Sequence, residues 1–534
     1  MKTVNYRADE LFQIYTRTKE FILEDYESQT SFDHVNPFWS HILSKRTNFP
    51  SFSETLSFLA NNSAYGLGKR MEENVELEKE SFHDAYLSIQ GDHLKELRNR
   101  VKESVIGFPK YFEEDSKVGS TSFTENIVST SRLVEAVEKH LQHKDKINVL
   151  EIGAGWGAVM SQLVQYFGDR INKVAICDLH ENLFISSFHL QSVFLDRNVG
   201  FVRGNEPFKG EDFSLNFASP SGIEHLEIEF DLVFNMISFQ EMNLDVVENY
   251  MQYIQNHLAK DGIFYSENGV QVKNTYGQAT KFSEYKYPEY FDIMELRNGA
   301  RFCPHLFFGN KHEAIMCHKN KEQERVIDPN HLDALSLLMH LRLDANIDDL
   351  RSRVISGKPT EADTDFLGLV HDFFSTSDRA TKKNVLGKIQ QTDFKTVYDY
   401  IQGLFCVSQK QFGKALSLFR SVEPELEGLV KINVMCYMGV LDKSVQADVI
   451  KRISELSPEM VNTAKGVFKH ASKSKRNMVD KITKQLHMDV KRIMGYSLYQ
   501  LSYAPSIMKE RLLKKIENKV VKMRHKNAIP YHLK

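Results

Sequence analysis

Short apolar runs alternate with longer amphipathic stretches through the middle of the chain. Four runs have the length of buried strands: 149–152, Lys173 to Cys177, Phe230 to Ile237 and Ile263 to Ser266. Apolar residues in the intervening segments recur at helical spacing. Strands that alternate with helices favour right-handed crossovers and a doubly wound, mostly parallel sheet. Weaker strand candidates lie at Gly200 to Arg203, Leu215 to Ala218 and His312 to His318.

The residues on either side of this region show helical patterns and no visible chemistry. With 534 residues the chain is too long for a single core, so several domains are expected. We predict an N-terminal helical cap at 1–115, an α/β domain at 116–320 and an all-α domain at 321–534. The N-terminal part is expected to cover the active site or to form an oligomer contact.

The last domain carries one pattern of a helical repeat. Five residues follow the helix-turn-helix spacing of a tetratricopeptide repeat: Gly403, Phe412, Ala415, Leu416 and Phe419. The tetrapeptides VEPE, at Val422, and LSPE, at Leu456, lie 34 residues apart, which is the period of that repeat. An ordinary helical bundle explains the same residues, and both interpretations stay open.

A small, polar stretch precedes the first clear strand. Residues Val118 to Thr130 read VGSTSFTENIVST, and a helix is predicted from Ser131 to about Leu141. The stretch is interpreted either as a loop that covers a cofactor or as a plain linker.

The first strand runs into a glycine-rich turn, NVLEIGAGWGA, that opens a helix. Gly153, Gly155 and Gly157 supply backbone freedom and leave the main chain accessible to a ligand. The free N–H groups of the following helix face the same turn. This combination predicts a nucleotide-cofactor site.

Polar residues stand at the ends of the predicted strands, where ligands bind in doubly wound sheets. Asp178 ends the second strand, about 20 residues after the glycines, and suits the hydroxyls of an adenosine ribose. The same carboxylate can cap the helix that follows. The expected cleft lining comprises Asp178, Asn235, Ser238, Glu241, Glu267 and Asn268.

The glycines also fit the dinucleotide pattern G-x-G-x-x-A, with Ala158 in the last position. Glu151 helps to choose between cofactors, because a carboxylate just before the first glycine would repel a pyrophosphate. In a site for S-adenosylmethionine, which has no phosphate, the same carboxylate can face the methionine ammonium. An oxidoreductase that uses NAD(P) and a scaffold that binds no cofactor remain as alternatives.

Several of these strings resemble a known family. VLEIGAGWG is similar to motif I of class I S-adenosylmethionine-dependent methyltransferases, which have a Rossmann-like sheet. DLHENLFISSFHL from Asp178, the string FDLVFNMISFQEMNLDVVENYMQYIQ from Phe230 and GIFYSENG from Gly262 resemble bacterial sugar O-methyltransferases. The resemblance covers about residues 118–318, and His180 stands where that family is expected to have proline.

The resemblance implies a site and a reaction. The methionine end of the cofactor would lie on Glu151, Gly153, Gly155 and Gly157, the ribose on Asp178, and Asn235 would line the same site. A sugar hydroxyl, of a bacterial surface polysaccharide or its precursor, would attack the sulfonium methyl in line. Removal of its proton needs a base. Glu241 is the first candidate, ahead of Glu267 and His305, although Glu241 can equally be a helix-stabilising carboxylate.

Composition adds little to this assignment. Hydrophobic residues make up 42% and charged residues 26%, and no apolar run is long enough to span a bilayer. Five scattered cysteines and an N-terminus without an apolar signal core predict a reduced, cytoplasmic protein. No metal site is predicted, because the histidines at 305, 312 and 318 are interpreted as hydrogen-bonded structural residues.

Charge is distributed unevenly. The net charge is −3, but residues 465–534 contain 18 Lys and Arg against 4 Asp and Glu. Between Ser506 and Lys526 apolar residues recur every three or four positions among basic ones, the pattern of a basic amphipathic helix. Two interpretations are open: a helix docked on its own domain, or peripheral attachment to the inner face of a membrane or to glycan-assembly proteins. Nucleic acid is not expected, because no aromatic stacking platform accompanies the charges.

Overall fold

The computed structural model describes the central domain and most of the C-terminal helices. The described residues are 8–25, 51–60, 92–104, 112–114, 117–203, 208, 214–269, 271–273, 279–281, 284–287, 291–298, 312–319, 345–355, 358–376, 378–426, 428–456, 461, 464, 465 and 468.

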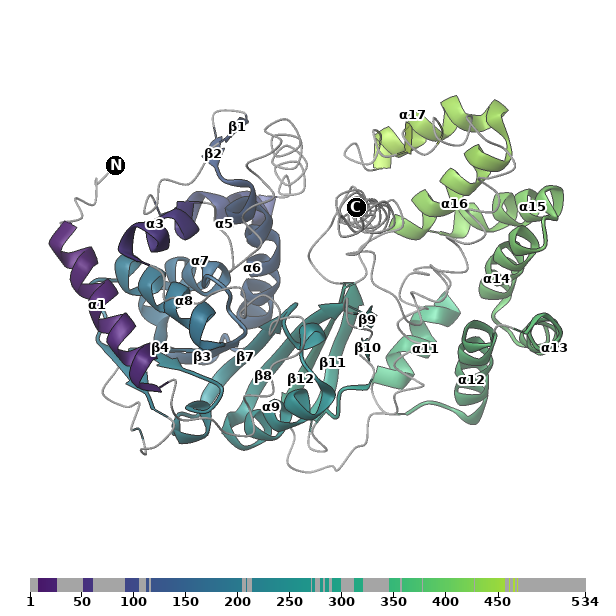
Figure 1. The fold of residues 1–534 in the computed structure, drawn as a ribbon. Coiled ribbons are helices and arrows are strands. Elements are labelled where there is room, and N and C mark those ends of the chain that lie inside the picture. The colour runs from purple at the N-terminus through teal and green to yellow at the C-terminus, as the bar shows by residue number, and fades with distance from the viewer. Residues whose placement is uncertain are drawn as a thin grey trace, which may run out of the picture.

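An eight-stranded sheet forms the centre of the molecule (Figure 1). Its order is β5 (Val199–Val202), β6 (Leu215–Ala218), β4 (Ile171–Cys177), β3 (Ile147–Ile152), β7 (Phe230–Met236), β8 (Leu258–Gly269), β12 (His312–Lys319) and β11 (Phe291–Asn298). Neighbouring strands from β5 to β8 are parallel, whereas β12 is antiparallel to both β8 and β11. The predicted doubly wound sheet is confirmed, including its weaker strand candidates.

The antiparallel strand distinguishes this sheet from a dinucleotide-binding one. The order β6-β4-β3-β7-β8 matches strands 3-2-1-4-5 of a doubly wound sheet. A dinucleotide-binding sheet continues with a sixth strand beside the fifth, in the order 3-2-1-4-5-6. Here β12 occupies that place and runs the other way, so the second half of the sheet follows a different plan.

Helices cover both faces of the sheet. Successive strand residues point to opposite faces and so pack into two separate apolar cores. Val149 packs with α6 (Thr121–His140), α7 (Ala158–Phe167) and α8 (His180–Val193). Leu150 and Ile152 point to the opposite face, toward α9 (Leu244–His257). Figure 1 shows α7 and α8 together on one side of the sheet and α9 on the other.

The described N-terminal helices add a further layer on α8. Helices α1 (Ala8–Asp25) and α3 (Phe52–Ala60) contact α8 directly. Helix α5 (Asp92–Arg100) contacts α6 and α7 instead. Helix α8 is therefore buried along most of its length, including polar side chains such as Ser187 and Gln191. Gln191 donates to the Thr18 hydroxyl at 3.0 Å and accepts from Arg17, so polar contacts hold α1 in place.

The polar stretch before the first strand forms most of the first half of a helix. The prediction of a loop at Val118 to Thr130 is therefore wrong. After the short strand β2 (Lys117–Gly119), which pairs with β1 (Phe112–Glu114), α6 begins at Thr121 with Ser120 as its N-cap. Hydroxyl side chains favour loops in isolation. Here they are buried and satisfied: Thr124 donates to the Ser120 carbonyl at 2.9 Å, and Thr130 donates to Gln162 of α7 at 2.8 Å.

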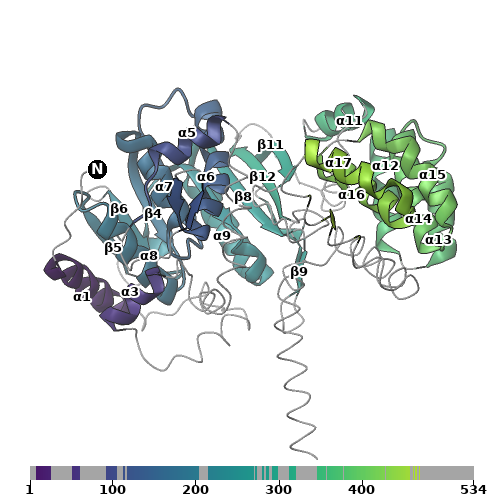
Figure 2. The ribbon, with the colours of Figure 1, turned by 90° about the horizontal axis from the view of Figure 1, so that it is seen from above.

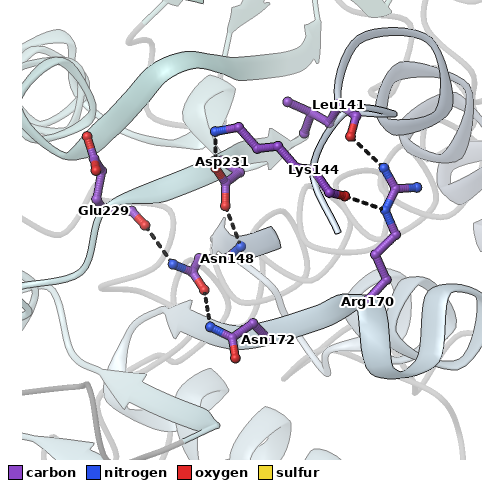
Figure 3. Close-up of polar contacts among 7 residues, drawn as sticks. All are labelled: Leu141, Lys144, Asn148, Arg170, Asn172, Glu229 and Asp231. Carbon is purple, nitrogen blue, oxygen red and sulfur yellow. Dashed lines mark hydrogen bonds and ion pairs between the residues drawn. The ribbon is translucent and has the colours of Figure 1, made fainter. Parts of the chain in front are cut away.

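A polar network ties the amino-terminal edge of the sheet, opposite the glycine turn (Figure 3). Asp231, at the start of β7, accepts the Asn148 N–H at 2.8 Å and pairs with Lys144 at 2.5 Å. Arg170 donates to the Leu141 and Lys144 carbonyls. These bonds join the loops before β3, β4 and β7, which fixes the register of the three strands that carry the site.

The C-terminal helices lie beyond the β11 edge of the sheet (Figure 2). They are α11 (Ala345–Ile355), α12 (Glu361–Ser375), α13 (Arg379–Ile389), α14 (Lys395–Ser408), α15 (Phe412–Val422), α16 (Gly428–Leu441) and α17 (Gln446–Leu456). One continuous apolar core runs from the α9 side of the sheet into them. Among the described residues, no helix is long and apolar enough to cross a membrane.

Two consecutive helical hairpins, α14 with α15 and α16 with α17, lie within this domain. α15 ends at Val422 and α17 at Leu456, and these are the positions at which VEPE and LSPE begin, 34 residues apart. Gly403 lets α14 approach α15, because a Cβ there would lie 2.6 Å from the Phe419 ring. The helical repeat with its 34-residue period and its tetratricopeptide class stay predictions.

Candidate functional site

The glycine turn joins β3 to α7 in a left-handed path. Gly153, Gly155 and Gly157 have φ of 75°, 59° and 80°, values that only glycine adopts without strain. The Gly153 N–H donates to the Cys177 carbonyl at 2.7 Å, which ties the turn to the end of β4. Gly157 is the N-cap of α7 and has no side chain to cap it, so the first turn of α7 presents its N–H groups to the bend.

The turn also packs against the loop after β7. A Cβ on Gly153 would lie 1.9 Å from the Ser238 Oγ, so glycine is required here by a protein contact. A Cβ on Gly157 would meet Leu190 of α8 at 3.3 Å. Two of the three predicted glycines therefore also have a structural reason in the packing of the turn.

Asp178 is hydrogen-bonded to the glycine turn. Its carboxylate accepts the Gly155 N–H at 2.7 Å, the Leu179 N–H at 2.7 Å and the Asn182 amide at 3.2 Å. Burial outweighs these hydrogen bonds and raises the pKa of Asp178 to about 7. Further hydroxyl donors would stabilise this carboxylate in its charged form.

Glu151 brings a second carboxylate to the same turn. It is 3% exposed, next to last in β3, and shares the sheet face of Val149, toward α6 and α7. Glu151 lies just before Gly153, and Asp178 is hydrogen-bonded to the turn. Two carboxylates in these positions would repel a phosphate group. Moreover, the Gly155 N–H, which a pyrophosphate would need, is already donated to Asp178.

Asn235 stands at the carboxyl end of β7 and is fully buried. Its amide nitrogen donates to the Ile152 carbonyl at 2.8 Å and to the Ser238 hydroxyl. Its oxygen accepts the Phe239 N–H at 3.3 Å and the Asn268 amide at 2.9 Å. The side chain thus joins the ends of β3, β7 and β8, and its assignment as a cofactor-binding residue stays a prediction.

The chain is strained where it leaves β7. Ile237 has φ of 67°, a left-handed value that costs a β-branched residue roughly 1–3 kcal/mol. Its N–H donates to the Glu267 carbonyl at 2.7 Å, which holds the unusual conformation. Strain of this kind is typical of functional sites, and here it directs the next residues across the strand ends. The sequence contains no signal for it.

Glu241 follows this turn, at the end of the 3₁₀ helix η6 (Phe239–Glu241), and is half-buried. The Phe239 ring of η6 packs against the rings of Tyr250 and Tyr285, with centroid distances of 5.9 and 6.0 Å. These contacts support η6. A hairpin of β9 (Gln271–Lys273) and β10 (Ala279–Lys281) contacts η6 as well. Glu241 is therefore partly exposed, on a turn that packs against neighbouring elements.

Glu267, the second candidate base, is completely buried and accepts the Tyr265 hydroxyl at 3.0 Å. Asn268 beside it accepts the Gln240 N–H at 3.1 Å, so both help to shape the floor of the site. His305 lies outside the described residues. The strand β12 contains His312 and His318, whose side chains are likewise outside the description.

His189 is a buried residue near the turn that sequence reasoning missed. Its ring lies 5.0 Å from that of Trp156, between Gly155 and Gly157, and it hydrogen-bonds the Trp156 backbone. Burial lowers its pKa to about 4, so it is neutral at physiological pH. A histidine within an apolar helix gave no signal other than core packing. Among the described residues, no group of three His, Cys, Asp or Glu side chains could hold a metal ion.

Comparisons with known proteins find similar solved structures only. No protein-family model matches the chain, and no curated protein does. Among solved structures, an S-adenosylmethionine-dependent methyltransferase from Clostridium acetobutylicum is 11% identical over 36% of this chain and 91% of its own, with a TM-score of 0.25. A TehB-like SAM-dependent methyltransferase from Corynebacterium glutamicum is 14% identical over 36% and 88%, with a TM-score of 0.24. The glycopeptide N-methyltransferase MtfA, complexed with S-adenosyl-L-methionine, is 11% identical over 36% and 87%, with a TM-score of 0.23.

Likenesses at these TM-scores support no inference about this chain. The class of the site follows from its own geometry: a glycine turn, an uncapped helix N-terminus and two carboxylates at the carboxyl ends of β3 and β4. These features are those of a Rossmann-like turn and suit a nucleoside cofactor.

Proposed function

We propose that the protein is an S-adenosylmethionine-dependent O-methyltransferase that acts on a sugar hydroxyl, of a bacterial surface polysaccharide or its precursor. One observation supports the cofactor above all: the Gly155 N–H is donated to the Asp178 carboxylate, with Glu151 buried just before the turn. Such a turn suits a cationic cofactor without phosphate. The acceptor rests on the resemblance of the strings around Asp178 and Phe230 to sugar O-methyltransferases.

The residues at the turn fit each part of this cofactor. The uncapped N-terminus of α7 would hold the methionine carboxylate. Glu151 would hold the ammonium, and Asp178, with its raised pKa, would accept the ribose hydroxyls. When bound, S-adenosylmethionine supplies a methyl group that is already activated by the sulfonium. The protein therefore has to orient the acceptor and remove its proton.

We assign the base to Glu241. It follows β7 at the end of the 3₁₀ helix η6 and is half-buried, which leaves part of its side chain open to an acceptor. In this role its carboxylate would take the proton of the acceptor hydroxyl while the O–CH3 bond forms and the S–CH3 bond breaks, with S-adenosylhomocysteine as the leaving group. Glu267 is completely buried and accepts a hydrogen bond from Tyr265, which favours a supporting role.

The oxidoreductase alternative rests on the G-x-G-x-x-A pattern alone. The antiparallel β12 beside β8 and the two carboxylates at the turn both argue against it. The scaffold alternative makes a different prediction: such a chain would retain the fold but bind neither S-adenosylmethionine nor NAD.

The substrate is tested by incubation with methyl-labelled S-adenosylmethionine and a panel of sugar nucleotides and lipid-linked glycan precursors, followed by mass analysis. We expect one added methyl group on a sugar oxygen. Label on a nitrogen, or on RNA or protein added in parallel, would contradict the sugar assignment and leave the cofactor in place.

The base is tested by Glu241→Gln. Turnover should fall about 100-fold or more, with nearly unchanged affinity for S-adenosylhomocysteine, because only proton removal is impaired. Glu248→Gln is the matched control, since Glu248 is an exposed carboxylate on α9 that pairs with Lys286. Activity of Glu241→Gln within a few-fold of the parent would place the base elsewhere.

A further inference from the structure

The last residue of α1, Asp25, reaches the carboxyl edge of the sheet from far away in the sequence. It is 2% exposed, and its carboxylate contacts His180 Nε2 at 3.1 Å and accepts the Ser219 hydroxyl. A buried carboxylate at a helix C-terminus is unfavourable both for desolvation and for the helix dipole. Its partners must therefore compensate for this position.

These partners belong to the two strand ends that frame Asp178. His180 opens α8, two residues after Asp178. Ser219 directly follows Ala218, the last residue of β6, and the Ala218 carbonyl accepts the Asp178 N–H at 3.3 Å. Asp25 thus bridges the loops after β4 and β6. A ligand that extends from the glycine turn over Asp178 continues toward this bridge, because β3, β4 and β6 are consecutive in the sheet.

We propose that Asp25 is a positioning residue for the adenosine half of the cofactor, so that docking of α1 and cofactor binding are coupled. This inference rests on the proposed cofactor. Asp25 holds the loops after β4 and β6 in the arrangement that the ribose and base require. Because coupling is reciprocal, the bound cofactor also stabilises the end of α1.

Other contacts keep α1 in place when Asp25 is changed. The Phe21 ring stacks on Phe201 at 4.4 Å, and the Tyr15 ring meets Phe184 at 5.8 Å. The neighbouring Glu24 provides a matched control. It pairs with Arg203, but both side chains are about half exposed, so this pair contributes little.

The test is calorimetry of the full chain with S-adenosylhomocysteine and with 5′-methylthioadenosine, which lacks the amino-acid end. Asp25→Ala should weaken both ligands alike, by about fivefold or more, whereas Glu24→Gln stays within about twofold of the parent. Asp25→Asn, of the same shape, serves if the alanine variant does not fold. Hydrogen exchange of residues 8–25 should slow on ligand binding in the parent and not in Asp25→Ala.

Three results would overturn the inference. Asp25→Ala could bind both ligands like the parent, or it could lose S-adenosylhomocysteine while retaining 5′-methylthioadenosine. Equal slowing of exchange in α1 of both proteins would also contradict it. A parent chain that binds neither ligand would instead contradict the proposed cofactor, and this inference with it.

Discussion

Asp178 is the residue whose surroundings add most to what the sequence indicates. Its place at the end of the second strand predicts a ribose contact, but not its bond to the Gly155 N–H or its pKa of about 7. The bond depends on how β4 and the turn come together and the pKa on burial, and a sequence pattern reports neither. The ionised form, needed to accept ribose hydroxyls, is therefore only partly populated near neutral pH.

Cofactor affinity should depend on pH through this carboxylate. We expect the dissociation constant of S-adenosylhomocysteine to be about tenfold larger near pH 6 than near pH 8, measured by calorimetry. Asp178→Asn should weaken binding and flatten the profile. A parent profile that is flat over this range would contradict the role of Asp178.

The stability of the free protein should show the opposite trend. The folded-state pKa of Asp178 lies above its unfolded value, so its contribution is fully present below about pH 4 and is lost as pH rises through about 7. Asp178→Asn should remove this loss, seen as a smaller fall in melting temperature between pH 5 and pH 8. No difference between the two proteins would show that Asp178 titrates normally.

At the level of elements, the sequence predicted the strands and turns whose patterns lie within a short stretch of the chain. Apolar runs located the strands of the central sheet except β11, and the glycines located the turn, since both signals lie within a dozen residues. The first half of α6, before Ser131, was missed because hydroxyl residues favour loops until tertiary burial satisfies them, as at Thr130 and Gln162. The contacts of Asp25 could not be predicted, because they join residues more than 150 positions apart.

The hairpin of α14 and α15 allows a direct test of helix packing. Gly403→Ala should destabilise the C-terminal domain by about 1–3 kcal/mol, because the new Cβ would lie 2.6 Å from the Phe419 ring. Gly368→Ala, inside α12 with nothing within 4 Å, should instead stabilise by up to about 1 kcal/mol through helix propensity. Urea unfolding of both variants measures the difference. Equal effects would refute the close approach.

For the whole molecule, the uneven charge is the property that the fold does not explain. The basic segment Ser506 to Lys526 lies outside the described residues. We propose that it binds an anionic membrane, where each basic residue contributes about 1 kcal/mol. The full chain should co-sediment with anionic but not neutral liposomes, and a version that ends at Pro505 should stay in the supernatant. Equal recovery of both proteins with both lipids would remove this role.

The identity of the cofactor is the claim on which the rest of the account depends. Titration calorimetry of the parent chain and of Gly155→Val, each with S-adenosylhomocysteine and with NAD, tests it most directly. We predict that the parent binds S-adenosylhomocysteine and not NAD, and that Gly155→Val binds neither, because a branched side chain at φ of 59° distorts the turn that holds the ligand. Binding of NAD by the parent, or unchanged binding of S-adenosylhomocysteine by Gly155→Val, would contradict the account.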